Sequence, residues 1–204
     1  MLTTTRDPRG RATVVDLLPP GLPRLFPVGR LDFDTEGLVL LTNDGEVAHA
    51  LLHPSLGSER EYRVAARGRV PASALAQLGA GVALDDGPTA PARVGPARFD
   101  ARSGATHFAL TLREGRKRQI RRALDALGHP VVRLLRVRMG PLRLGRLPAG
   151  GARPLSQSEI AALQRDAHRR RAQRAGSQAP QASVAVRKTR ARARSKSRNY
   201  HRNR

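Results

Sequence analysis

Three carboxylates alternate in a short polar stretch near the N-terminus, and they are the residues best suited to chemistry. They are Asp32, Asp34 and Glu36, and the cation Arg30 lies beside them. A carboxylate on a loop that is anchored by a rigid strand can act as a nucleophile or as a general base. Spacing alone leaves a plainer interpretation open, in which Asp32 only caps a turn or pairs with Arg30.

The hydrophobic run directly after this stretch predicts the strand that would hold the loop. Leu38–Leu41 is the most continuous apolar run of the region, and it is bounded by Gly37 and by the Asn-Asp-Gly turn at 43–45. Such a run indicates a buried strand. Either of the first two turn residues can cap a helix that begins near Glu46.

A second dense group of polar residues follows Glu114. Apolar residues at the spacing i, i+4, i+7 predict an amphipathic helix that ends at Gly128: Ile120, Leu124 and Leu127. Its expected first turn carries three successive cations: Arg116, Lys117 and Arg118. Cations at a helix N-terminus, with its free N–H groups, can bind phosphate. On charge alone, a solvated basic face is an equal alternative.

Composition and charge point to a polyanionic partner. The chain has 204 residues, a net charge of +22 and no cysteine. The lack of cysteine excludes disulfides, thiolate zinc sites and cysteine nucleophiles. No apolar stretch has membrane-spanning length and no signal-peptide pattern opens the sequence, so we expect a cytoplasmic protein. A nucleic acid is the simplest partner, and a membrane surface is the weaker alternative.

The charge is concentrated towards the C-terminus. From Arg165 onwards there are fourteen Lys and Arg and a single acid, so this part carries +13 and the rest keeps +9. We predict a folded domain over residues 1–174 and a disordered Arg/Lys-rich tail over 175–204, which binds RNA through counterion release.

The remaining elements are read from periodicity and from turn residues. We expect strands at 59–65, 92–99, 106–112 and 129–140. Helices are expected at 46–52 and at 71–78, with Pro71 in the first turn, and a loop at 79–91. A further helix is expected to begin at Gln157, after a capping box formed by Ser156 and Glu159. His49 and His53 are spaced i, i+4 and could share a helix face. No third ligand accompanies them, so we predict no metal site.

Several of these stretches together resemble one family. Gly-Arg-Leu-Asp at 29–32, followed by Thr-Glu-Gly-Leu-Val-Leu-Leu-Thr-Asn-Asp-Gly at 35–45, is similar to the signature of pseudouridine synthases. The likeness is to the rRNA branch that includes small-subunit synthase A and, most of all, large-subunit synthase B. The runs at 4–19, 59–65, 115–121, 129–145 and 153–156 match the same family in the same order.

The resemblance implies roles for individual residues. Asp32 would be the catalytic residue, the ring of Tyr62 would stack on the target base, and Arg121 would pair with Asp32. The other residues expected to contact RNA are Arg30, Arg116, Lys117, Arg118, Gln119 and Arg136. The implied fold is α/β (α+β): a mixed, mostly antiparallel sheet in two lobes around a basic cleft.

The implied activity is isomerisation of one uridine in ribosomal RNA, most simply 23S, by a monomer without metal or other cofactor. The family usually carries a small S4-type RNA-binding domain in front, and neither this domain nor the start of the first strand is present in the sequence. One rival function is a non-catalytic RNA-binding or ribosome-assembly factor that keeps the fold. Another is a generic basic nucleic-acid protein with only chance likeness to the family.

Overall fold

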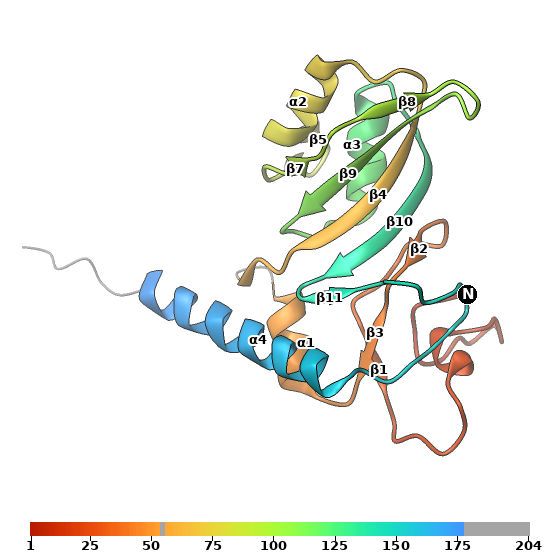
Figure 1. Ribbon diagram of the computed structural model, residues 1–204, viewed down its shortest axis with the longest axis vertical. Helices are drawn as coiled ribbons and strands as arrows, with labels where there is room; N and C mark the ends of the chain where they lie inside the picture. Colours follow the sequence, from red (N-terminus) through yellow and green to blue (C-terminus); the bar gives the residue numbers. More distant parts are fainter. Residues whose placement is uncertain (54–55, 178–204) are drawn as a thin grey trace, which may run out of the picture.

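A seven-stranded sheet forms the larger lobe of the computed structural model, which describes residues 1–53 and 56–177 (Figure 1). Its main path runs β11-β10-β4-β9-β7, with β2 on β10 and β8 on β9. The strands are β2 (Glu36–Gly37), β4 (Arg60–Arg67), β7 (Arg93–Val94), β8 (Arg98–Asp100), β9 (Ala105–Leu112), β10 (Val131–Met139) and β11 (Leu142–Arg143). Within this sheet, only the β2–β10 pair is parallel. The predicted mixed, mostly antiparallel sheet is therefore confirmed.

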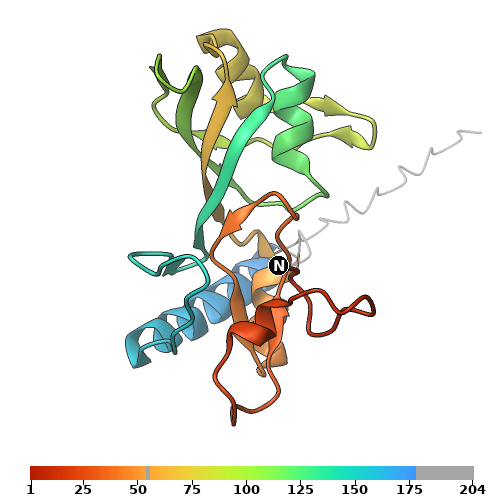
Figure 2. The same ribbon diagram turned by 90° about the vertical axis from the view of Figure 1, so that its right-hand side faces the viewer.

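Two helices cover one face of this sheet and enclose the first core. They are α2 (Ala72–Ala80) and α3 (Gln119–Ala126), and Figure 2 shows α3 beside β10. Side chains alternate along a strand, so Val64 and Ala66 of β4 share a face and pack with Leu110, Ile120 and Leu124. Burial of this apolar surface holds α3 in place, and the start of α3 contacts the polar loop that the sequence singled out.

A second, smaller core is formed by elements that lie below the large sheet in Figure 1. There β1 (Phe26–Val28) pairs antiparallel with β3 (Leu40–Thr42), and α1 (Gly45–Leu52) and α4 (Gln157–Ser177) pack beside them. The predicted caps are confirmed. The Asp44 carboxylate accepts from the backbone N of Glu46 at 2.8 Å, and Ser156 and Glu159 exchange hydrogen bonds as a capping box.

Three local predictions need correction. The run 38–41 is not one buried strand, because residues 36–37 pair with β10 and only 40–42 pair with β1. Residue Pro71 is the N-cap of α2 and not part of its first turn. The expected loop at 79–91 holds a small hairpin of β5 (Ala83–Leu84) and β6 (Gly87–Pro88). In addition, a 3-10 helix, for which we made no prediction, spans Val14–Leu17.

Helix α4 runs three residues past the expected domain boundary at 174. The rest of the predicted tail, 178–204, lies outside the described residues. Among the described helices, none is long and apolar enough to cross a membrane.

Candidate active site

The polar loop before β2 is folded back by a tight turn. The backbone N of Thr35 donates to the carbonyl of Asp32 at 3.0 Å, so Asp34 lies in the middle of the turn. The N-terminal segment fastens the residue before Asp32, because the Thr3 hydroxyl lies 3.2 Å from the backbone N of Leu31 and accepts its hydrogen bond. The loop backbone is thus held on both sides of Asp32.

Gly37 lets the end of the loop approach β10 very closely. Its φ is +118°, and an added Cβ would lie 2.3 Å from the carbonyl oxygen of Arg136. The next backbone N, of Leu38, donates to that same carbonyl at 2.9 Å. Only glycine combines this backbone conformation with so close an approach, so the sequence at 37 determines where the loop meets the sheet.

The side chain of Arg136 ties the two ends of the loop together. It is 2% exposed, and its Nε donates to the carbonyl of Leu38 at 2.8 Å while Nη1 donates to the carbonyl of Arg30 at 3.3 Å. Its Nη2 is buried without a hydrogen-bond partner among the described residues. Arg136, which we expected to contact RNA, here uses its guanidinium on the protein's own backbone.

Helix α3 holds the middle of the loop through Asp34. Arg118 donates to both Asp34 oxygens, at 3.0 and 3.1 Å, and Arg121 Nε lies 3.2 Å from Oδ2 as an ion pair without hydrogen-bond alignment. The Arg118 hydrogen bonds, helped by the charge of Arg121, hold the pKa of the Asp34 carboxyl below its usual value. This loop is therefore docked on α3 through a charged contact.

The pairing of Arg121 with Asp32 that the resemblance implied is absent from this structure. Arg121 contacts Asp34 and the carbonyl of Val131 instead, because the turn at 32–35 directs Asp34 towards α3. Within the described residues, we find no hydrogen bond or ion pair to the half-buried Asp32 carboxylate. Its electrostatic neighbour is Arg118, whose pKa is raised first by Asp34 and also by Asp32.

Tyr62 is placed beside the same loop by strand pairing. It lies on β4 directly opposite Arg136 of β10, and its ring packs half-buried against the first core. Because Arg136 binds both ends of the loop, this register places Tyr62 beside the residue that holds the Asp32 loop. The sheet thus supplies one aromatic ring and the loop one carboxylate with no ion pair.

The basic residues near α3 are arranged differently from the prediction. Three of them precede the helix rather than forming its first turn, and Arg118 is the N-cap in a left-handed conformation with φ +49°. Arg116 forms an ion pair with Asp86 of the β5–β6 hairpin. Gln119, which we expected to contact RNA, is 5% exposed, and its Oε1 accepts from the backbone N of Arg116 at 3.2 Å.

Three of the predicted RNA contacts are exposed: Arg30, Lys117 and Arg118, the last of which binds Asp34. The roles of Asp34 and Arg136 as anchors were missed by the sequence reasoning. A signal was present for Arg136, since a single arginine surrounded by apolar residues of a strand (Leu134, Leu135 and Val137) is placed to be buried. Nothing in the sequence separates Asp34 from Asp32 as the residue that binds α3.

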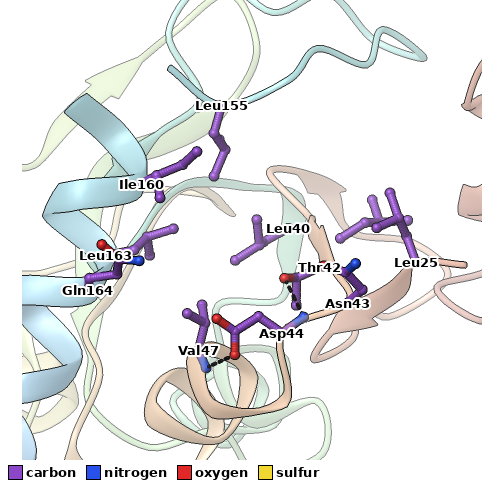
Figure 3. A pocket seen from close by; sticks show the side chains of 11 residues that line it. Leu25, Leu40, Thr42, Asn43, Asp44, Val47, Leu155, Ile160, Leu163 and Gln164 are labelled. Carbon is purple, nitrogen blue, oxygen red and sulfur yellow. Dashed lines mark hydrogen bonds between the residues drawn. The ribbon is translucent and has the colours of Figure 1, made fainter. Parts of the chain in front are cut away.

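Neither of the two pockets described in the structure is lined by Asp32. The first has a volume of about 300 Å³ and lies between α4 and the turn that caps α1. Figure 3 shows its apolar side chains, among them Leu40, Val47 and Leu163, with the Asp44 cap at the rim. In the part of the chain that is described, no group of three His, Asp or Glu could hold a metal ion.

Comparison with known proteins decides the family. The family model described as RNA pseudouridylate synthase matches residues 5–126. The chain belongs to this family. A solved structure titled as a pseudouridylate synthase has a TM-score of 0.67 at 37% identity, over 74% of this chain and 65% of that one. The α/β fold in two lobes is therefore that of a pseudouridine synthase.

Curated relatives with similar sequences are also named pseudouridine synthases. Ribosomal large subunit pseudouridine synthase B of Bacillus subtilis (strain 168) is 39% identical over 80% of this chain and 67% of its own length. The protein of the same name in Salmonella typhi is 47% identical over 74% of this chain and 52% of its own length. An "uncharacterized RNA pseudouridine synthase" of Aquifex aeolicus is 41% identical over 78% of this chain. The chain spans 63% of the length of that Aquifex protein.

Proposed function

We propose that this chain converts one uridine of ribosomal RNA, in the 23S molecule, into pseudouridine. The observation that carries the proposal is a loop whose backbone is fastened on three sides while the Asp32 carboxylate forms no ion pair among the described residues. Because the loop already holds this carboxylate in place, little reorganisation of the loop is needed when a substrate reaches it. Family membership and the large-subunit relatives support the choice of RNA.

The proposed reaction is an isomerisation, so the product has the same atomic composition as the uridine. The uridine is flipped out of its stack, and Asp32 initiates cleavage of the bond between N1 and C1′, as a nucleophile or as a base. The uracil turns within the site, C5 bonds to C1′, and the proton of C5 is lost while N1 gains one. Tyr62 supplies a π-face for the displaced base. The isomerisation needs no net oxidation, so the proposal includes no cofactor.

Arg121 acts in this proposal as a positioning residue. Its ion pair with Asp34, together with that of Arg118, keeps the loop docked on α3 and so keeps Asp32 in place. Exposed Arg30 and Lys117 contact RNA phosphates. The proposed enzyme is cytoplasmic and a monomer. Light scattering of the purified chain would test the monomeric state directly.

The test is carbodiimide and primer-extension mapping of in vitro transcribed 23S rRNA after treatment with the chain. We expect a reverse-transcription stop at one uridine that is absent with Asp32→Asn. The matched control is Asp125→Asn, an exposed carboxylate on α3, which should leave the stop unchanged. A chain that binds the RNA but produces no stop would instead be the non-catalytic assembly factor, and equal stops with both variants would remove Asp32 from the chemistry.

A further inference from the structure

A polar groove of about 620 Å³ lies between α4 and the ends of the long strands. In Figure 1, α4 runs below the lower ends of β4 and β10. Arginines dominate the groove lining: Arg113, Arg138, Arg143, Arg169 and Arg170. Two acids, Glu59 and Asp166, accompany them, so the lining carries a net charge of +3.

Glu59 organises one wall of this groove. Its carboxylate binds Arg138 at 3.0 Å, Arg113 at 3.0 Å and, more loosely, Arg93 at 3.6 Å. Arg138, followed by Arg113, lowers the pKa of Glu59, so the carboxylate stays ionised. One negative charge holds three guanidinium groups, from β7, from β10 and from the residue after β9, which leaves this wall positive and its arginines oriented.

Asp166 organises the opposite wall, on α4. It is 6% exposed and binds the guanidinium groups of Arg169 and Arg170. Arg170 also donates to the carbonyls of Leu56 and Gly57, at 3.0 and 2.8 Å, and so attaches α4 to the segment that precedes β4. The groove is therefore formed by fixed elements on both sides.

Three of the guanidinium groups remain available to a ligand. The side chains of Arg113 and Arg169 are 73% and 66% exposed although each has one ion pair. Arg143 of β11 is exposed and forms no ion pair with a described residue. Planar guanidinium groups bind phosphate oxygens through two parallel hydrogen bonds.

The groove opens on the other side of the sheet from the Asp32 loop. Arg138 reaches Glu61 at 2.9 Å, and Glu61 is the neighbour of Tyr62 in β4. Adjacent residues of a strand point to opposite faces, so the arginine cluster and the Tyr62 ring lie on opposite faces of the same strand. The groove is a surface separate from the proposed active site.

We infer that this groove binds the phosphate backbone of RNA that flanks the target nucleotide, an inference that rests on the proposed RNA substrate. The described lining contains no aromatic side chain, whereas protein interfaces are usually anchored by buried aromatic residues. Oriented, partly exposed arginines without an apolar anchor suit a polyanionic backbone. An RNA bound there and at the Asp32 loop would be held on both faces of the sheet.

The test compares two pairs of variants in the Asp32→Asn background, so that binding is measured without turnover. Arg143→Gln with Arg169→Gln removes two groove charges. Arg98→Gln in β8 with Arg102→Gln in the β8–β9 turn removes two exposed charges beside the first half of β9, away from the end of that strand that leads to Arg113. The probe is a short fluorescein-labelled RNA hairpin, and its affinity is measured by anisotropy over a series of salt concentrations.

We expect the groove pair to weaken hairpin binding about tenfold and to lower the slope of log affinity against log salt by about 1 to 2. The Arg98 and Arg102 pair should change both quantities by much less. Circular dichroism would verify the fold, and Arg113→Gln gives an independent groove variant. Equal effects of the two pairs, or an unchanged slope, would overturn the inference. Either result would overturn it even if the groove variants lost affinity for a poly-glutamate peptide. A wild-type chain that shows no isomerisation would leave this binding result intact.

Discussion

At the scale of the residue, hydrogen bonds and ion pairs hold the neighbours of Asp32, while its own carboxylate forms no ion pair in the described structure. Leu31 is bound by Thr3, Asp34 by two arginines of α3, and the ends of the loop by Arg136. The sequence indicated the carboxylates and their loop. It could not assign the anchors, because Asp32 and Asp34 are chemically the same residue and only the turn between Asp32 and Thr35 distinguishes them.

Arg136 should act on catalysis through the loop and not through RNA affinity. Lysine keeps the charge of Arg136 but cannot reach two carbonyls at once. We expect Arg136→Lys to lower kcat about 100-fold, since a shift of about 1 Å in a reacting group has such an effect, while the Kd for RNA changes less than about twofold. Single-turnover kinetics and filter binding would measure the two quantities.

Arg133→Gln is the control on the same strand, because Arg133 is exposed and solvent screens its ion pair with the exposed Glu36. It should leave kcat within a small factor of the wild-type value. A loss of RNA affinity in Arg136→Lys as large as the loss of kcat would contradict the positioning role.

The ion pairs of Asp34 should stabilise the folded chain to an extent that depends on pH. Folding lowers its pKa from the ordinary 3.8, so its ion pairs stabilise the folded chain above that value, and the stabilisation is lost as the pH falls through the lowered pKa. The Tm difference between wild type and Asp34→Asn should be constant down to about pH 5 and shrink below about pH 4. The side chain is 42% exposed, so the difference is small. A difference that grows on acidification would exclude the ion pair as its cause.

At the scale of the element, β10 is the strand on which the site is built. It pairs with β4, β11 and β2, and so brings Tyr62 and the loop to one place. The alternation of apolar and charged residues predicted this strand and the strands β4 and β9. It did not predict the two-residue strand β2, because a pair of residues held by a glycine contact has no periodicity to read.

Gly37 should be the most sensitive glycine of the loop. An alanine there would bring Cβ to 2.3 Å from a backbone oxygen at a φ of +118°. We expect Gly37→Ala to lower the free energy of unfolding by about 3 kcal/mol and to reduce activity with it. Gly45→Ala, at the start of α1 with no atom within 4 Å of the new Cβ, should change stability by less than about 1 kcal/mol. Urea unfolding would compare them, and equal values would refute the close contact.

At the scale of the whole molecule, two cores are joined by the loop and by the ends of the long strands. Charge and family motifs predicted a basic, two-lobed domain for RNA. They did not predict that many of its arginines bind carboxylates of the same chain, such as Arg116 with Asp86 and Arg138 with Glu59. Such pairs join residues far apart in sequence, and only the folded topology brings them together.

The measurement that tests the central claim most directly is tritium release from 23S rRNA transcribed with uridine labelled at C5. Formation of the bond between C5 and C1′ expels the label. The account predicts release by the wild-type chain and none by Asp32→Asn, with equal RNA binding by the two proteins. Release by Asp32→Asn at the wild-type rate would contradict the assignment of Asp32 as the catalytic residue.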